Sequence, residues 1–521
     1  MTQALTIIRL PGECWYGGTI TEGYRMPYMP GYQGDTSQHG GNQSAPVLLS
    51  TQGRVIWCEG PFTFQVTTNQ LRVQAIDPDD KIELSVGGST LAHAYRRASA
   101  DHFPFGNGMP DPLLFSAPQY NLWIELLYRP TQAKVLAYAD AVLANGFPPG
   151  VLMIDTLWSP TYTPWRFDAG RFPDPKAMAE ALHARGFKLM VWVAPFVTAD
   201  TLTFRKLREQ GCLITGADGK PVIAQWWDGY SATLDLLNPA TVTWLHEHLD
   251  WLVHEIGVDG FKFDGGDPDF YAPLGVSDPL AYCTAWNKIG LRYSMSEFRA
   301  AWKVGGLPLM QRIRDRHHTW DEQHGLQSLI PLAIAQGLDG YPFNCPDMIA
   351  GGDYGAFPPS PENQEFLLAE FAVPPLDAEL FVRSAQCAAL FPMMQFSAAP
   401  WRVLDAEHAA YCRAAAQLHA QLGPEIRALA EQAAQTGEPI LRSLEYVFPG
   451  RGYEAVRDQF LLGDAILVAP VLVKGARSRL VRFPPGDWQD ENGDVLHGPI
   501  QLEVAAPLNR LPWYRTVGVG K

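Results

Sequence analysis

The apolar positions of residues 1–117 fall in short runs that alternate with polar positions. The runs VIWCEGPFTFQV (Val55–Val66), LRVQAI and KIELSV have the period of two that is typical of strands, and turn residues such as Pro78, Asp79 and Asp80 close them. No long helical period stands out in this part of the chain. Residues 1–117 therefore predict an N-terminal β-sandwich domain.

The pattern changes from Tyr120 onward, where strands and helices alternate. WIELLY (Trp123–Tyr128) reads as a strand, and a helical stretch ending at Gly146 follows it. Then come the strands GVLMID, KLMVWVAP and GFKFDGG, separated by the helices PKAMAEALHARG and PATVTWLHEHLDWLVHEIG. Apolar strands that alternate with amphipathic helices indicate a parallel sheet covered by helices. The number of units favours a closed (β/α)8 TIM barrel over residues 118–436.

Strands return after Gly437, in ILRSLEYVF, QFLLGDAILVAPVLV and SRLVRFPPG. These runs predict a small C-terminal β-sandwich domain over residues 437–521. The predicted fold class is therefore α/β, with a TIM barrel flanked by two β domains.

Composition and charge narrow the choice of partners. The chain has 521 residues, 47% of them hydrophobic, and a formal net charge of -15 without any basic run, which excludes nucleic acid and anionic membrane surfaces. The chain contains no run of about 18 apolar residues, so no membrane span is predicted. The seven cysteines are scattered singly, and the N-terminus lacks a signal-peptide pattern. A cytoplasmic protein with reduced thiols is expected, and its oligomeric state, homo-oligomers included, is left open.

Carboxylates at predicted strand ends are the candidates for catalysis. Asp155 ends one strand, Lys262 and Asp264 lie on alternate positions at the end of another, and LMQRIRDRHHTW brings Asp315. Glycoside hydrolysis needs two such carboxyl groups. Taken singly, Asp264 could instead cap the turn that follows it, and Asp315 could form a solvated ion pair with the neighbouring arginines.

At these residues the chain resembles glycoside hydrolase family 31. The similarity includes residues 153–197, with RFPDP before a helix, the strand DGFKFDGGD, the segment from Arg299 to Trp320, and GLQSLIPLAIAQGLDGYPFNCPDMIAGG. The resemblance implies that Asp264 is the nucleophile and Asp315 the general acid/base. It also implies a set of substrate-binding residues, namely Asp155, Trp192, Lys262, Arg299, Trp320 and Asp347.

The chain departs from the family pattern in two places. The family commonly has a Trp-x-Gly-Asp run at the acid, where this chain has Arg312-Ile313-Arg314-Asp315. The family often ends its barrel with a sugar-binding Arg-x-His pair, where FPMMQFSAAPW offers Gln395 and Ser397. The variant pattern resembles the α-galactosidase-type members of the family.

The predicted function is a retaining α-glycoside hydrolase that acts by double displacement and removes terminal α-linked galactose from a small oligosaccharide or glycoside. An α-glucosidase, an α-xylosidase or a transglycosidase of the same family is the alternative, and a non-catalytic carbohydrate-binding protein is the alternative from another class. No cofactor is expected. No metal is expected either, because His317, His318 and His324 lack the spacing of metal ligands.

Overall fold

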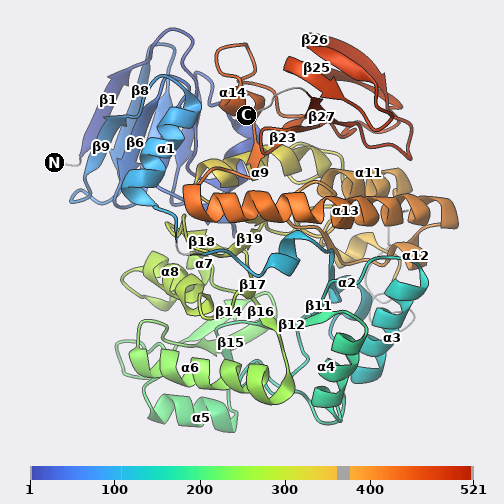
Figure 1. Ribbon diagram of the computed structural model, residues 1–521. Helices are drawn as coiled ribbons and strands as arrows, with labels where there is room; N and C mark the ends of the chain where they lie inside the picture. Colours follow the sequence, from blue (N-terminus) through green and yellow to red (C-terminus); the bar gives the residue numbers. More distant parts are fainter. Residues whose placement is uncertain (1–2, 107, 361–375, 518–521) are drawn as a thin grey trace.

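The computed structural model describes residues 3–106, 108–360 and 376–517. Figure 1 shows a central barrel with its helices, an N-terminal β part in blue and a C-terminal β part in red. The two β parts lie beside each other on the same side of the barrel.

The N-terminal part consists of two four-stranded antiparallel sheets. In β7, Phe62, Phe64 and Val66 are buried while Thr63 is exposed, which is the alternation of a strand with one face on the core. The first sheet has the strand order β1 (Ala4–Ile8), β8 (Gln70–Ala75), β7 (Phe62–Val66), β3 (Gln33–Asp35). The second has the order β2 (Trp15–Tyr16), β5 (Val47–Ser50), β6 (Arg54–Cys58), β9 (Ile82–Val86).

One helix of this part was not expected from the sequence. Helix α1 (Leu91–His102) packs against β5 and β6. It begins where the hydroxyl of Thr90 accepts a hydrogen bond from the backbone N–H of His93. Its buried face includes Leu91, Ala94, Tyr95 and Ala98, a helical spacing that the sequence analysis overlooked.

The barrel consists of eight strands whose neighbours all pair in parallel, as predicted. The two end strands of this ladder meet through a parallel bridge between Met348 and Gln395, so the barrel is nearly closed. The strands, in order around the barrel, are β10 (Gln119–Asn121), β11 (Val151–Ile154), β12 (Lys188–Val193), β16 (Gly260–Phe263), β17 (Met295–Phe298), β19 (Met310–Arg312), β20 (Asn344–Cys345) and β21 (Gln395–Phe396).

Helices surround the barrel, and a small sheet is inserted after β12. The inserted strands are β13 (Phe196–Thr198), β14 (Ile223–Trp226) and β15 (Gly229–Thr233). The main helices are α3 (Gln132–Ala144), α4 (Pro175–Ala184), α5 (Leu202–Glu209), α6 (Pro239–Trp251), α8 (Pro279–Gly290), α9 (Leu329–Leu338), α11 (Ala378–Ala388) and α13 (Ala406–Thr436).

The predicted strand WIELLY is wrong. Strand β10 ends at Asn121, whose side chain accepts a hydrogen bond from the backbone N–H of Trp123 and starts a turn. Residues Trp123–Leu126 form the short helix α2, which ends where Leu127 adopts a positive φ of 43°. A short apolar run suits a buried strand and a buried helical turn equally, so the pattern alone could not separate them.

The C-terminal part is one six-stranded sheet, in the order β22 (Leu441–Arg442), β23 (Phe460–Leu462), β24 (Ile466–Val468), β27 (Trp513–Val517), β25 (Ser478–Gln489), β26 (Val495–Ala505). The predicted strand ILRSLEYVF is only partly correct. Its second half is helix α14 (Leu444–Val447), because the hydroxyl of Ser443 accepts a hydrogen bond from the backbone N–H of Tyr446 and caps a helical turn.

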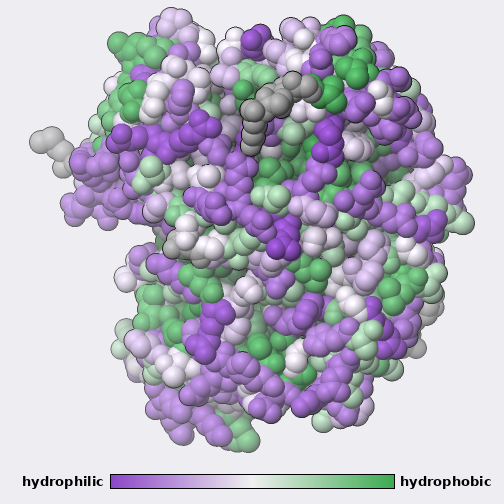
Figure 2. All heavy atoms as spheres, viewed as in Figure 1, coloured by the Kyte–Doolittle hydropathy of each residue, from purple (hydrophilic) through white to green (hydrophobic). Residues whose placement is uncertain are grey.

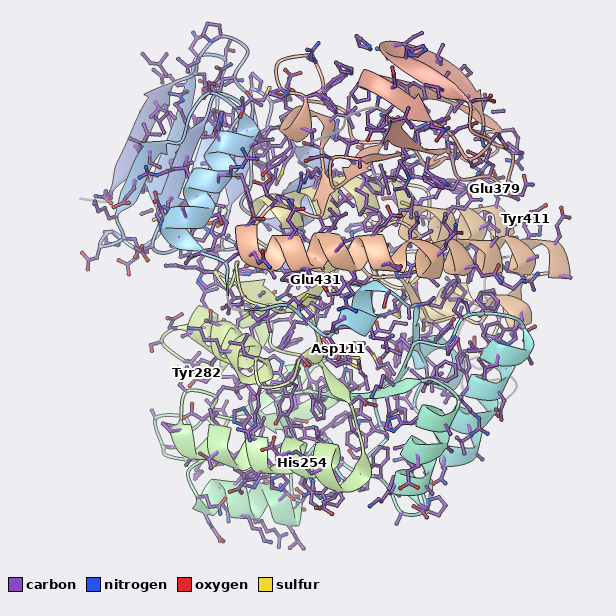
Figure 3. The ribbon with its side chains drawn as sticks, viewed as in Figure 1. Asp111, His254, Tyr282, Glu379, Tyr411 and Glu431 are labelled. Carbon is purple, nitrogen blue, oxygen red and sulfur yellow. The ribbon has the colours of Figure 1, made fainter. Side chains whose placement is uncertain are left out.

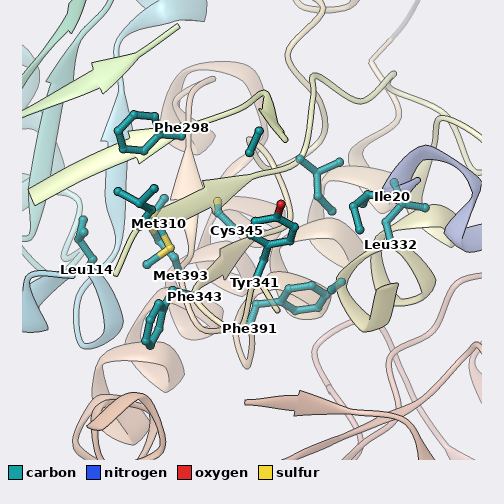
Figure 4. Close-up of a cluster of buried hydrophobic side chains, with 14 of the residues drawn as sticks. Ile20, Leu114, Phe298, Met310, Leu332, Tyr341, Phe343, Cys345, Phe391 and Met393 are labelled. Atoms are coloured by element: carbon teal, nitrogen blue, oxygen red, sulfur yellow. The ribbon is translucent and has the colours of Figure 1, made fainter. Parts of the chain in front are cut away.

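Buried contacts join the three parts. In Figure 4, Phe298 and Met310 of the barrel strands, Leu332 of α9 and Ile20 of the N-terminal part belong to one apolar cluster. Arg383 of α11 is fully buried and joins the barrel to the C-terminal part. Its guanidinium donates to the backbone carbonyls of four residues of the C-terminal part, namely Ala476, Ala506, Pro507 and Arg510.

Helix α11 makes a second contact with the C-terminal part. Figure 3 labels Glu379 on this helix and Tyr411 on α13. The carboxylate of Glu379 pairs with Arg477 at 2.5 Å. The barrel is therefore joined to both β parts, by the apolar cluster and by the polar contacts of α11.

Candidate active site

The carboxyl ends of the barrel strands carry the charged residues that the sequence analysis selected. Asp155 follows β11, Asp264 follows β16, Arg299 follows β17, Asp315 follows β19 and Asp347 follows β20. In a parallel barrel these ends open at one mouth. Ion pairs described below connect most of these side chains into one network.

Asp264 lies at the centre of this network and is 8% exposed. Its Oδ1 accepts hydrogen bonds from Arg299 Nε and from the backbone N–H of Gly265, both at 3.0 Å, and its Oδ2 accepts one from Trp192 Nε1 at 3.1 Å. The bond from Gly265 shows that Asp264 does cap the following turn. The other bonds come from side chains at the mouth, so capping is not its only role.

The charge of Asp264 is fixed by its neighbours. Burial would raise the pKa of this carboxyl, but the positive charges of Arg299, Lys262 and Arg312 outweigh burial and hold the pKa well below its usual range. Asp264 is therefore an ionised carboxylate at any pH near neutrality, as a nucleophile needs to be.

Lys262 bridges two carboxylates. Its Nζ lies 2.8 Å from Asp155 Oδ2 and 3.8 Å from Asp264 Oδ2. Burial would lower the pKa of this ammonium, but the negative charge of Asp155 together with that of Asp264 raises it above its usual value. Lys262 is therefore a fixed positive charge between the ends of β11 and β16.

Arg299 connects Asp264 to a second carboxylate and to the N-terminal part. Its two terminal nitrogens bind Asp267 Oδ1 and Oδ2, both at 2.8 Å, and Nη1 also donates to the carbonyl of Gly41 at 2.8 Å. Gly41 has a φ of 72°, and a Cβ there would lie 2.5 Å from Arg299 Nη1. Glycine is thus required at this point of contact.

Asp315 is open to the cleft, with a side chain that is 47% exposed. Its Oδ1 accepts a hydrogen bond from Arg312 Nη1 at 2.7 Å. Desolvation would raise the pKa of Asp315, but Arg312, Lys262 and Arg299 together lower it. Asp315 therefore does form an ion pair, but its partner Arg312 is a buried arginine at the barrel mouth and not a solvated surface residue.

Asp347 lies behind Asp315 and is fully buried. Its Oδ1 accepts a hydrogen bond from Arg312 Nη1, and its Oδ2 accepts one from the backbone N–H of Arg316 at 2.6 Å. Burial raises the pKa of this carboxyl to about 6, with the charge of Asp315 adding to the effect and Arg312 opposing it.

Trp320 has its contacts elsewhere. Its indole N–H donates to Asp377 Oδ2 at 2.9 Å, at the start of α11. The hydrogen bonds and ion pairs described above for Asp264, Lys262 and Arg299 do not involve Trp320. A role of Trp320 in substrate binding stays a prediction.

The sequence analysis missed an aromatic hairpin that faces the mouth. Trp226 ends β14, and Trp227 at the tip of the hairpin is 48% exposed, with the Arg299 guanidinium 5.7 Å from its ring centroid. Trp226 stacks with Trp192 at a centroid distance of 6.4 Å. The pair of tryptophans before Asp-Gly was the available signal, because such a turn commonly closes a hairpin.

Asp228 at the same hairpin tip is also new. It accepts hydrogen bonds from the hydroxyl groups of Tyr128 at 2.9 Å and Tyr162 at 2.7 Å. Burial raises the pKa of Asp228, the hydrogen bonds from the two tyrosines oppose this, and the charges of Asp155 and Asp264 add to the rise. The hairpin therefore adds polar as well as aromatic groups to the mouth.

Other kinds of site find little support in the described ranges. Residues 3–106, 108–360 and 376–517 contain no cluster of three or more His, Cys, Asp or Glu side chains arranged to hold a metal ion. In the same ranges no helix is both long enough and apolar enough to cross a membrane.

Sequence comparisons agree with the barrel and the C-terminal part. Residues 112–301 match the model of the "Glycosyl hydrolases family 31 TIM-barrel domain", and residues 437–518 match that of the "Glycosyl hydrolase family 31 C-terminal domain". Together the two matches span about half of the chain. The chain belongs to glycoside hydrolase family 31.

Relatives within family 31 are similar over much of the chain. The myogenesis-regulating glycosidase of Mus musculus is 32% identical over 419 residues, which are 78% of this chain and 57% of the relative. The 1,3-alpha-isomaltosidase of Kribbella flavida is 27% identical over 393 residues, which are 66% of this chain and 50% of the relative. The chain thus spans about half the length of these relatives.

Solved structures of the family share the fold. The dextranase of Flavobacterium johnsoniae, complexed with glucose, aligns with a TM-score of 0.84 at 20% identity and covers 98% of this chain and 66% of that one. A family 31 α-xylosidase from a soil metagenome, complexed with xylose, aligns with a TM-score of 0.80 at 22% identity and covers 99% of this chain and 79% of that one.

The network predicts a pH-dependent loss of stability in Arg299→Met. Removing this cation leaves Asp264 and Asp267 buried without their partner, which should cost about 3–5 kcal/mol at pH 7. Asp264 has a pKa below its unfolded value, so its stabilising contribution exists above about pH 3.9 and is lost as the pH falls through the folded-state pKa. The difference between wild type and variant should therefore narrow below about pH 4.

Urea denaturation at several pH values measures this difference. The control is Arg314→Met, because Arg314 is exposed and, among the residues that the structure describes, its guanidinium donates only to the carbonyl of Gly40. A loss in Arg299→Met that stays the same at every pH would show that the arginine acts through packing alone.

Proposed function

We propose that this chain is a retaining α-glycoside hydrolase, with Asp264 as nucleophile and Asp315 as general acid/base. The observation that carries the proposal is the contrast between the two carboxyl groups. Asp264 is buried and held ionised by donors from three barrel strands, while Asp315 is half-exposed at the same mouth. Retaining glycosidases use two carboxyl groups in these two roles.

The first step forms a covalent intermediate. Asp264 attacks the anomeric carbon through an oxocarbenium-like transition state, while protonated Asp315 gives its proton to the departing oxygen and the glycosidic bond breaks. The hydrogen bonds from Arg299 and Trp192 hold the carboxylate of Asp264 in one orientation, so little rearrangement is needed before attack.

The second step releases the sugar. Asp315, now ionised, takes a proton from water, and the hydroxyl oxygen attacks the anomeric carbon and displaces Asp264. Two inversions give net retention of the α configuration. A transglycosidase would use the same residues with a sugar hydroxyl in place of water, so acceptor competition alone separates the two activities.

The identity of the sugar rests on other observations. The prediction of galactose used Ser397 as the residue in place of a sugar-binding histidine. Ser397 is fully buried, and its hydroxyl accepts a hydrogen bond from the backbone N–H of Ile124 at 2.9 Å. Gln395 is also buried and donates to Glu297 at 2.6 Å. Both residues therefore support the barrel and offer the sugar no direct contact.

The names of relatives favour a different sugar. Among them are the 1,3-alpha-isomaltosidase of Kribbella flavida, alpha-glucosidase 2 of Bacillus thermoamyloliquefaciens and an alpha-xylosidase of Emericella nidulans. We therefore propose an α-linked glucosyl or xylosyl unit at the cleavage site, in a small oligosaccharide or glycoside. An α-galactosyl unit is the second candidate, supported by the resemblance of GYPFNCPDM to galactosidase-type members.

The surface suits a small neutral substrate. The formal net charge is -15, and Figure 2 shows hydrophilic residues over most of the face in view, with small apolar groups scattered between them. Polyanions are repelled by such a surface. A non-catalytic carbohydrate-binding protein would not need one buried and one half-exposed carboxyl group at the same mouth, so the site favours an enzyme.

The two carboxylates should respond differently to substitution. Asp264→Asn should abolish turnover of every substrate, because no nucleophile remains. Asp315→Asn should lower kcat/KM roughly 100- to 10,000-fold on glycosides with a poor leaving group, and far less on dinitrophenyl glycosides, whose departure needs no proton. Steady-state kinetics with a series of aryl α-glycosides measures both effects.

The matched control is Asp269→Asn, an exposed aspartate in the short helix α7 (Pro268–Tyr271). It should keep wild-type kinetics. Near wild-type turnover in Asp264→Asn, or equal losses across the leaving-group series in Asp315→Asn, would contradict the assigned roles.

A panel of nitrophenyl α-glycosides tests the sugar. We expect a higher kcat/KM on the α-glucoside or α-xyloside than on the α-galactoside. Asp155→Ala should lower kcat/KM on the preferred sugar by roughly 10- to 100-fold, since this carboxylate is the proposed acceptor of sugar hydroxyl groups. A clear preference for the α-galactoside would instead support the second candidate and leave the mechanism unchanged.

A further inference from the structure

Arg312 neutralises more carboxylates than one positive charge can balance. The guanidinium is 1% exposed, with Nε 3.0 Å from Glu297 Oε1. Its Nη1 donates both to Asp315 Oδ1 at 2.7 Å and to Asp347 Oδ1. A second buried negative charge beside one cation is costly, so a proton on one of these carboxyl groups relieves the excess of negative charge.

Asp315 and Asp347 accept hydrogen bonds from the same nitrogen of Arg312, so protonation of one affects protonation of the other. When Asp347 carries the proton, the charge of Arg312 is balanced by Asp315. When Asp315 carries it, Asp347 provides the balance. The proton can therefore be on either carboxyl group without leaving the buried guanidinium unpaired.

We propose that Arg312 and Asp347 are positioning residues that set the charge of Asp315, with Arg312 fixing its carboxylate and Asp347 offsetting the guanidinium so that Asp315 can take up a proton. The inference rests on the proposed role of Asp315 as acid/base. In the first step Asp315 gives its proton to the leaving oxygen, and both carboxylates then share Arg312. In the second step water returns a proton to Asp315.

Other charged groups face this pair and stay in place in the variants below. Lys262 of β16 and Arg299 after β17 lower the pKa of Asp315 from across the mouth. Glu297 of β17 faces Arg312, and the backbone N–H of Arg316 binds Asp347. Asp264 adds a negative charge that acts on Arg312. Differences between variants thus report on Arg312 and Asp347 themselves.

The test is the pH dependence of kcat/KM on a nitrophenyl α-glycoside. Its alkaline limb reports loss of the proton from the acid. Asp347→Asn removes one of the negative charges that compete for Arg312, so the guanidinium acts more strongly on Asp315 and the limb should move to lower pH. Arg312→Gln removes the cation, so the limb should move to higher pH, by roughly 1 unit or more. Arg312→Lys keeps the charge and should restore the wild-type limb in part.

Asp339→Asn is the control for substitution of a buried barrel aspartate. Asp339 is fully buried at the end of α9, and burial raises its pKa far above the usual value, so the amide closely resembles the protonated acid. The alkaline limb of the Asp339→Asn variant should match that of the wild type. If Arg312→Gln does not fold, the direction in which Asp347→Asn moves the limb still tests the proposal.

The proposal is overturned if Asp347→Asn leaves the alkaline limb in place or moves it to higher pH. If Asp347 had a purely structural role, its substitution would not move the limb to lower pH. An independent readout is the ¹³C NMR signal of the Asp315 carboxyl carbon, followed against pH in ¹³C-aspartate-labelled protein. The signal is assigned by its loss in Asp315→Asn. The pKa of the Asp315 carboxyl group measured in this way should fall in Asp347→Asn. If the wild type hydrolyses no glycoside, the proposed function fails, while this titration still decides the coupling.

Discussion

A carboxylate buried at a barrel mouth stays ionised only when fixed cations and N–H donors face it. Asp264 meets this condition through Arg299, Lys262 and Trp192, which come from three neighbouring strands. The barrel supplies the spacing of these groups, because the ends of parallel strands lie side by side. A change of register in β12 or β17 would remove one of these partners from the carboxylate.

The same constraint explains why the N-terminal part belongs to the site. Arg299 is held by Asp267 and by the carbonyl of Gly41, and the strand pair β4 (Gln43–Ser44) and β18 (Ala301–Trp302) fixes this loop beside the end of β17. The N-terminal part thus orients the cation that keeps Asp264 ionised. The N-terminal part contributes a backbone carbonyl and no side chain to this contact, so its amino-acid types gave no indication of a role in the site.

The sequence predicted the barrel and its flanking β parts well, because long strand and helix periods repeat through residues 151–263. It failed where a short run was decided by one side-chain hydrogen bond. The side chain of Asn121 starts the turn that leads into WIEL, and Ser443 caps the helical turn LEYV. Both residues are visible in the sequence, but their effect depends on where the preceding strand ends.

The site was predicted unevenly. Strand-end carboxylates such as Asp155 and Asp264 follow from the barrel pattern and from the family resemblance. Asp228 and Trp227 lie on an inserted hairpin, which no barrel rule places at the mouth. Arg312 appeared only as a departure from the family motif. Its partner Asp315 is a neighbour in the chain, but Glu297 and Asp347 come from segments that only the folded barrel brings together.

The most direct test of the account is to trap the covalent intermediate. A 5-fluoro-α-glycosyl fluoride of the preferred sugar slows both steps, and its fluoride leaves without help from Asp315, so the glycosyl-enzyme should accumulate. Mass spectrometry of the intact protein should show one added fluoroglycosyl unit, and peptide mapping should place it on Asp264. An adduct on another carboxylate, or turnover to a product of inverted configuration without any adduct, would contradict the role of Asp264.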